Sequence, residues 1–219
     1  SVTESGNPLP LVEAGIDAGG NLVAGTTTHS FTVSVSDGNG DTPIFAKSGW
    51  TLVSGTTYSK VGVYGTATFN IVTGLVTYTL NNNDADTQAL AAGQAVIDHI
   101  AVTVFDGKGG IDTEDLQIGI VGTNDKPINV VPSVTQSVIV DTDFQFGTQP
   151  YNSIQVSDDS AALTVTLGVT QGALTLNGIA GLNFTTGDGT GDVTMTFSGN
   201  RTDINAALQG MTFSPDATF

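Results

Sequence analysis

The chain has 219 residues, and its 21 acidic against 5 basic residues give a formal net charge of −16, so its surface repels the phosphate backbone of nucleic acids. It contains no cysteine, which excludes disulfides and thiol catalysis, and no apolar run approaches the roughly 20 residues that a membrane-spanning helix needs. Its 28 glycines, with abundant Thr, Val and Asp, are typical of short strands joined by tight turns. We therefore expect an all-β protein whose acidic loops repel one another unless cations bind.

The first strong strand signal lies at residues 31–35, where apolar and polar residues alternate. This segment runs directly into Asp37, Asn39 and Asp41, which place a side-chain oxygen at every second position. The spacing resembles the first half of a calcium loop, because Ca²⁺ binds such oxygen ligands. The sequence thus predicts a half-buried strand that ends in a candidate calcium loop.

Three further segments complete the first half of the chain. Residues 66–80 predict a hairpin, and residues 96–121 predict two more strands around a turn that begins at Asp106. Between them, residues 81–93 predict a short helix, because an Asn or Asp can cap its start, Ala and Leu fill it, and a glycine ends it.

A joint between two domains is predicted near the middle of the chain. Asn124 and Asp125 supply side-chain oxygens there, and Pro127 holds the preceding residue out of a helix and stiffens the exit. Oxygen-only ligands at a joint favour a hard cation, Ca²⁺. The predicted division is a first domain at residues 1–124, a calcium-binding linker at 125–127 and a second domain at 128–219.

The second half of the chain repeats the order of the first half at a nearly constant spacing, which indicates a duplicated architecture. The counterpart of Asp106 would fall near position 224, after Phe219. The second domain is therefore expected to lack its last turn and last strand, and either to leave an open edge or to find a substitute strand. The matched positions are Asp37 and Asp158, 121 residues apart, Val76 and Val193, 117 apart, and Ala89 and Ala207, 118 apart.

Several motifs together resemble a known family. Those of residues 1–127 resemble the VCBS repeat, and those of residues 128–219 resemble, less closely, a cadherin-like repeat. The motifs of the first part are Val2-Thr3-Glu4 and residues 64–66, 77–82, 88–93, 102–110 and 122–127, and those of the second part are residues 156–160, 187–192 and 203–208.

Proteins with these repeats are giant bacterial surface adhesins, often of the RTX type, that are exported by type I secretion and act in attachment and biofilm formation. The resemblance implies two tandem Greek-key β-sandwich modules of cadherin or immunoglobulin type, the second truncated at its carboxyl end, with Ca²⁺ at the junctions. It implies a monomer whose partners are neighbouring repeats of the same chain, and a role as a stiff extender at the cell surface.

In such a sandwich successive loops fall at alternate ends. The loops at Asp37 to Asp41 and at Asp106 should then share the amino-terminal end of the first module. At the other end, acidic residues of both modules should complete one calcium shell of 6 to 8 oxygens, more than any single loop supplies. Glu4 could add a carboxylate by analogy with cadherin-like first strands. The ligands expected at the junction are Asp84, Asp86, Asn124, Asp125, Asp158, Asp159, Asp188 and Asp192.

Three alternatives stay open. Each acidic residue could simply form a turn, because Asp-Gly and Asn-Gly are also hairpin signals. Trp50, Tyr58 and Tyr64 cluster in an unusual segment and could bind a surface glycan or another ligand, although aromatics in a sandwich core are commoner. The modules could also accompany a secreted hydrolase. The chain itself is not expected to be an enzyme, since neither histidine has an evident catalytic partner.

Overall fold

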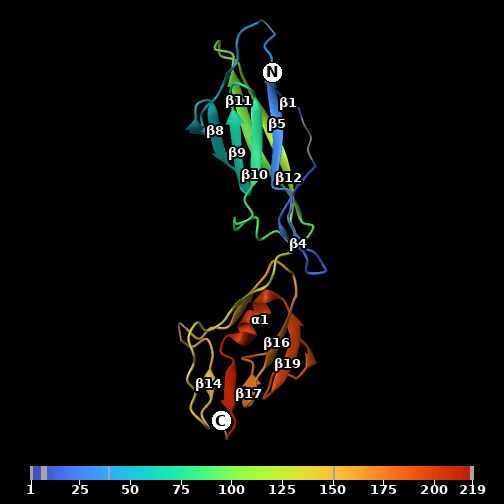
Figure 1. Cartoon of the computed structure of the whole chain (residues 1–219), viewed down its shortest axis with the longest axis vertical. Helices are drawn as coiled ribbons and strands as arrows, with labels where there is room; N and C mark the ends of the chain where they lie inside the picture. Colours follow the sequence, from blue (N-terminus) through green and yellow to red (C-terminus); the bar gives the residue numbers. More distant parts are fainter. Residues whose placement is uncertain (1, 6–8, 39, 150, 218–219) are drawn as a thin grey trace. The chain divides into compact units, whose positions relative to one another are not determined.

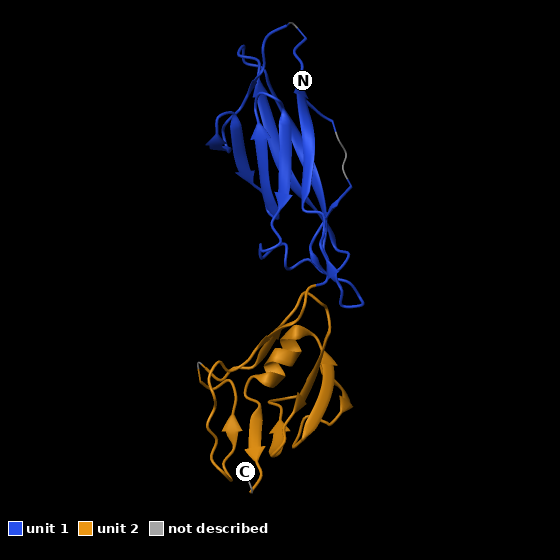
Figure 2. Cartoon of the chain, viewed as in Figure 1, with its two compact units in different colours: residues 1–124 blue, residues 125–219 orange. Residues whose placement is uncertain are grey.

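The computed structural model describes residues 2–5, 9–38, 40–149 and 151–217. The chain divides into two compact units, residues 1–124 and residues 125–219 (Figure 2). The regular secondary structure of both units is almost entirely β-strand, as the composition predicts, with one short helix in the described part of unit 2. That helix is far too short to cross a membrane, and no helix of the described ranges could do so.

Unit 1 consists of two main sheets that face each other across one hydrophobic core (Figure 1). The first sheet contains, in spatial order, β1 (Val2–Ser5), β5 (Thr28–Val35), β10 (Leu75–Leu80), β9 (Gly65–Asn70), β8 (Thr57–Val61) and β7 (Thr51–Ser54). The second contains β2 (Leu11–Val12), β12 (Ile111–Val121), β11 (Ala95–Phe105) and β6 (Ile44–Phe45). A separate two-stranded ribbon is formed by β3 (Gly15–Ile16) and β4 (Leu22–Val23), which follow β2 and precede β5 in the sequence.

The strand predictions for unit 1 are confirmed, because its strands alternate as the pattern requires. Phe31 and Val33 of β5 are buried, as are Ile100, Val102 and Val104 of β11. The hairpin β9–β10 turns at residues 71–74, and β11 and β12 form a continuous antiparallel ladder of eleven residue pairs. Apolar residues on alternate positions of each sheet thus fill the core.

One carboxylate also lies in this core, on the same face of β11 as its apolar residues. Asp98 is buried, and its Oδ2 accepts hydrogen bonds from the Tyr78 hydroxyl at 2.5 Å and from the Tyr64 N–H at 3.2 Å. Since Tyr78 belongs to β10 and Asp98 to β11, the pair ties the two sheets together. Burial, and then the hydrogen bond to Asp98, raise the pKa of Tyr78 far above its usual range.

The prediction of a helix at residues 81–93 is wrong. All of these residues are described, and they form a series of turns. The Asn81 side chain accepts the N–H of Asn83 at 3.1 Å, and the Asp84 side chain accepts the N–H of Asp86 at 2.9 Å. Asn and Asp side chains that bond the backbone two residues ahead compete with helical hydrogen bonds, so the segment stays a chain of turns.

The segment of the second half that the repeat spacing matches to residues 81–93, around Ala207, does form a helix, α1 (Arg201–Leu208) of unit 2. Asn200 caps it by accepting the N–H of Asp203 at 2.9 Å, and its apolar residues Ile204, Ala207 and Leu208 are buried in the core of the unit. The strands around it form three small sheets: β13 (Ile128–Val130) with β15 (Gln155–Ser157); β14 (Phe144–Gln145), β20 (Thr212–Pro215) and β17 (Gly172–Thr175); and β16 (Leu163–Gly168), β19 (Thr194–Gly199) and β18 (Asn183–Thr186).

The duplication is only partial. β18 and β19 repeat the hairpin of β9 and β10, but the strand that leads into Asp158 does not take the place of β5. That strand, β15, pairs with β13, while β16 pairs with β19 as β5 pairs with β10. The inserted pair β13–β15 therefore presents Asp158 in a setting that unit 1 does not repeat at Asp37.

Candidate metal centre

Three aspartates of unit 2 come together where β13 and β15 begin and end. β15 runs into Asp158 and Asp159, and its antiparallel partner β13 is entered from Asp125 through Pro127. Because Ile128 lies opposite Ser157, the residues just outside this ladder are neighbours, and the N–H of Asp125 donates to Oδ1 of Asp159 at 3.1 Å. The sequence prediction that Asp125, Asp158 and Asp159 converge holds within unit 2.

Two carboxylate oxygens of this cluster lack the hydrogen bonds that burial requires. Asp158 is 9% exposed, and its Oδ1 accepts the N–H of Ser160 at 2.6 Å. The Oδ2 atoms of Asp158 and Asp159 are both buried, and neither has a hydrogen-bond donor. Leaving a buried acceptor unsatisfied costs about 1–3 kcal/mol, and more when it is charged. A cation between these oxygens would remove that cost.

The electrostatics of the cluster point in the same direction. The pKa of Asp125 is raised, first by burial and then by the negative charges of Asp159 and Asp158. Arg201, at the start of α1, donates to the backbone carbonyl of Asp158 at 3.2 Å and so also fixes the position of this residue. The cluster therefore concentrates negative charge in a place held by two strands and a helix.

The three side chains do not by themselves enclose an ion. Among the described residues, no group of three or more His, Cys, Asp or Glu side chains is placed so that these side chains alone could hold a metal ion. All side-chain atoms in the cluster that could coordinate a metal are oxygens. This suits Ca²⁺, whose coordination is flexible and is often completed by carbonyls and water. The residues that would hold the ion are Asp125, Asp158 and Asp159.

Asp188 and Asp192 do not join this cluster. They lie in the turn before β19, whereas Arg201, whose side chain donates to the Asp158 carbonyl, follows the other end of β19. Six strand residues separate the two ends, or about 20 Å. The Asp192 carboxylate instead accepts the N–H groups of Asp188 and Gly189, at 3.0 and 2.7 Å, and Asp188 accepts that of Thr190 at 3.0 Å. These hydrogen bonds favour the turn interpretation, and a metal-binding role for Asp188 and Asp192 stays a prediction.

The predicted acidic loops at one end of unit 1 do lie side by side. Asp37, Asp106 and Asp112 line a common recess of about 160 Å³. However, the Asp106 carboxylate accepts the N–H groups of Lys108 and Gly110, at 2.7 and 2.8 Å, and these bonds lower its pKa. Asp41, four residues after Asp37, is half-buried, and Asn39 lies outside the described residues. Both hydrogen bonds go to Oδ1 and favour the turn interpretation of Asp106, and that this loop binds Ca²⁺ stays a prediction.

Asn124, Asp84 and Asp86 belong to the other end of unit 1. The Asn124 carbonyl accepts the N–H of Ile16 at 2.7 Å, and the loop of Asp84 and Asp86 returns to the sheet where the N–H of Gly93 donates to the Gly122 carbonyl at 2.9 Å. That these residues share a calcium ion with those of unit 2 stays a prediction.

A buried carboxylate that was not predicted from the sequence, Glu13, lies at this same end. It is fully buried, and its oxygens accept the N–H of Thr123 at 3.1 Å and the side-chain amide of Gln88 at 3.3 Å. The available signal was an acid placed directly after the apolar pair of β2. Glu4, which was considered instead, lies opposite Val33, and burial followed by the charge of Glu114 raises its pKa.

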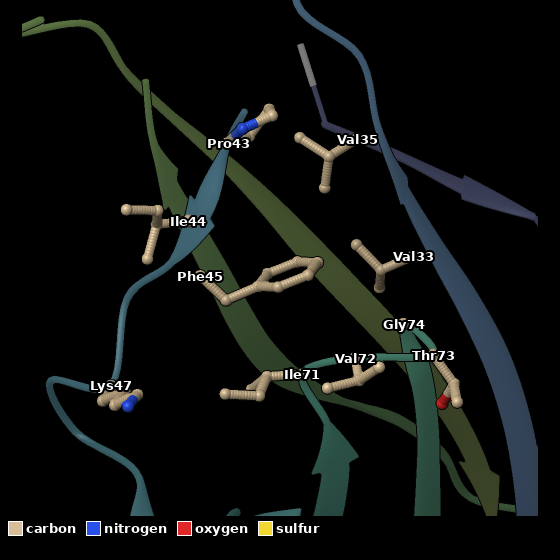
Figure 3. Close-up of a pocket in the computed structure, with 10 residues that line it drawn as sticks. All are labelled: Val33, Val35, Pro43, Ile44, Phe45, Lys47, Ile71, Val72, Thr73 and Gly74. Atoms are coloured by element: carbon tan, nitrogen blue, oxygen red, sulfur yellow. The ribbon is translucent and has the colours of Figure 1, made fainter. Parts of the chain in front are cut away.

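The aromatic segment that could bind a ligand turns mostly inward. Tyr58 is buried, Trp50 and Tyr64 are half-buried against the core, and the Trp50 ring lies 5.5 Å from that of Phe69. Unit 1 also has an open recess of about 460 Å³ (Figure 3). Most of its lining residues are apolar, and they include Val33, Val35, Pro43, Ile44, Phe45 and Ile71. The buried position of Tyr58 and the half-buried positions of Trp50 and Tyr64 against the core favour the core interpretation of these three aromatic residues.

Comparison with known proteins adds no assignment, because no family model and no curated protein matches the chain.

Proposed function

We propose that this chain is a calcium-binding structural segment of a secreted bacterial surface adhesin, and that one of its ions is held by Asp125, Asp158 and Asp159. The observation that carries the proposal is the pair of buried, donor-free oxygens on Asp158 and Asp159 beside a third carboxylate with a raised pKa. A folded protein rarely keeps such oxygens unless something else satisfies them.

Calcium suits this cluster better than the alternatives. Thiolate and imidazole ligands would favour zinc, whereas all three side chains here are carboxylates. Magnesium demands a near-ideal octahedron and keeps much of its water, so it is poorly matched to partly buried carboxylates on two strand ends. Calcium accepts irregular oxygen shells and would neutralise the mutual repulsion.

The wider role rests on the chain as a whole. It is all-β, strongly acidic and free of cysteine, so bound cations could supply the cross-links that disulfides supply in other extracellular proteins. In this proposal calcium stiffens successive modules of one long chain, which projects a ligand-binding region from the bacterial surface for attachment or biofilm formation. Neighbouring repeats are the partners, and the chain itself catalyses no reaction.

Calcium titration of the 219-residue chain by calorimetry tests the site. The double variant Asp158→Asn/Asp159→Asn keeps both Oδ1 acceptors but removes two charges, and we expect its tightest affinity to fall at least about tenfold. Asp188→Asn is the matched control, since it removes a charge from an exposed turn of the same unit. Equal calcium affinity in the double variant and the wild type would refute the site.

Stiffening needs a separate measurement. X-ray scattering with and without a chelator should show a larger radius of gyration, or a broader distribution of sizes, once calcium is removed. The control is the double variant, whose profile should respond less to the chelator. Identical profiles for the wild type under both conditions would contradict the extender role without bearing on calcium binding itself.

A further inference from the structure

An Asn-Gly pair lies at the surface of unit 2, shortly after β17. Asn177 and Gly178 are both exposed, and they directly follow Leu176, which is buried in the core of the unit. The position that a Cβ at Gly178 would take is open, with nothing within 4 Å of it. Water therefore reaches both residues, and the peptide bond between them is accessible from the glycine side.

The side-chain amide of Asn177 is not held by a hydrogen bond to any described residue, unlike those of other asparagines in unit 2. Asn205 accepts the N–H of Val156 at 2.8 Å and donates to its carbonyl at 2.9 Å, and Asn200 accepts the N–H of Asp203 at 2.9 Å. The Gly178 N–H likewise donates to no backbone carbonyl of the described residues. Neither the side-chain amide of Asn177 nor the next backbone nitrogen is thus restrained by a hydrogen bond.

We propose that Asn177 is a site of spontaneous deamidation in the folded chain. The Gly178 nitrogen bonds to Cγ of Asn177, the bond from Cγ to Nδ2 breaks, and ammonia leaves with the proton of the Gly178 amide. Glycine favours this step because it has no Cβ to hinder the approach. Water then opens the cyclic imide at one of its two carbonyls, which gives either aspartate or isoaspartate at position 177.

The new carboxylate would lie beside the carboxyl-terminal end of α1. The Asn177 N–H donates to the Ala207 carbonyl at 3.0 Å, and a Cβ at Gly210 would lie 3.1 Å from Cγ of Asn177. The helix dipole disfavours negative charge at this end, and α1 has no basic residue in its last turn to offset it. Isoaspartate would in addition lengthen the backbone between positions 177 and 178. Deamidation should therefore weaken the packing of α1, and this inference does not depend on calcium.

Position-resolved mass spectrometry of the 219-residue chain tests the reaction. The chain is incubated in mildly alkaline buffer, once folded and once unfolded in urea, so that the ratio of the two rates isolates the effect of the fold. Conversion at Asn177 should be at most about tenfold slower in the folded chain than in urea. Asn200 and Asn205 serve as internal controls that stay unconverted in the folded chain, and Asn39, in the only other Asn-Gly pair, is scored on a separate peptide.

The matched variant is Asn177→Gln, which keeps a side-chain amide and should abolish conversion at this position. A folded chain that converts Asn177 at least about a hundredfold more slowly than the unfolded chain would overturn the proposal, because the fold would then protect the site.

The effect on α1 has its own test. Asn177→Asp reproduces the aspartate product, and the amides of α1 should exchange with solvent about two- to fivefold faster in it than in Asn177→Gln. Amides at the centre of the β11–β12 ladder of unit 1 are the reference, and they should exchange equally in both variants. Equal exchange of α1 in the two variants would refute the predicted weakening of the helix.

Discussion

Two acidic strand ends, at Asp106 in unit 1 and at Asp158 in unit 2, look alike in the sequence and differ in structure. The turn after Asp106 directs two backbone N–H groups at its carboxylate, which lowers the pKa of that residue. The chain after Asp158 supplies one N–H to Oδ1 and none to Oδ2. Both N–H groups at Asp106 bond Oδ1, so the difference lies in the second oxygen, which is buried without a donor at Asp158. A strand-end aspartate therefore becomes a candidate metal ligand when the oxygen that its own turn leaves without a donor is also buried.

Removal of calcium should produce the largest difference in thermal stability between the two units. At a free calcium concentration one hundred times the dissociation constant, binding adds about 2.7 kcal/mol of stability. For a domain of this size that corresponds to about 10–20 °C in melting temperature. Hydrogen exchange on heating should show a chelator-induced shift of this order in β13 and β15 of unit 2. A shift confined to unit 1 would reverse the comparison.

Charge removal in unit 2 should have opposite effects with and without calcium. Asp159→Asn keeps the oxygen that accepts the Asp125 N–H but removes the charge that acts most on Asp125. Calcium affinity should fall about tenfold, whereas the metal-free protein should gain about 1 kcal/mol because a buried repulsion is lost. Chemical denaturation with chelator present measures the second effect, and a loss of stability there would show that the charge is already compensated.

The pH dependence of metal-free unit 2 should reflect the raised pKa of Asp125. A carboxyl whose pKa is higher in the folded than in the unfolded state destabilises the fold above its folded pKa, and this penalty disappears as the pH falls below the unfolded value, about 3.9. Between pH 7 and pH 4 the wild type should therefore gain stability relative to Asp125→Asn. Parallel melting curves for the two proteins would argue against a buried, repelled carboxylate.

Asp106 should show the opposite sign and the smallest effect. Its folded pKa is lowered, so its contribution to stability is present above the unfolded value and is lost as the pH falls through the folded value. Asp106→Asn should slightly lower the melting temperature of unit 1 at pH 7, with less difference at pH 3, and should leave the strongest calcium affinity unchanged. Loss of that affinity would move the principal site to unit 1.

The sequence predicted the features that depend on local pattern. Alternation located β5, β11 and the hairpin β9–β10, and the repeat spacing that matches Ala89 to Ala207 located α1. The same reasoning failed at residues 81–93, where Ala and Leu suggested a helix but side chains of Asn81 and Asp84 took the backbone hydrogen bonds.

Long-range pairing explains the remaining differences. Asp158 and Asp159 meet Asp125 only because β13 pairs with β15, and Asp192 is directed away by the length of β19. Nothing in the composition of the segment between β13 and β15 predicts that Phe144 and Gln145 pair with β20. Glu13 and Asp98 are buried by partners distant in sequence, such as Thr123 and Tyr78, which no local pattern reveals.

The hydrogen bond between Tyr78 and Asp98 has an optical consequence. Burial beside a carboxylate keeps the Tyr78 phenol protonated in strongly alkaline solution for as long as unit 1 stays folded. Of the four tyrosines in the chain, this one should contribute its phenolate absorbance only when the two sheets separate. In a spectrophotometric titration with base, the phenolate absorbance of Tyr78 would thus report the opening of unit 1 without any added label.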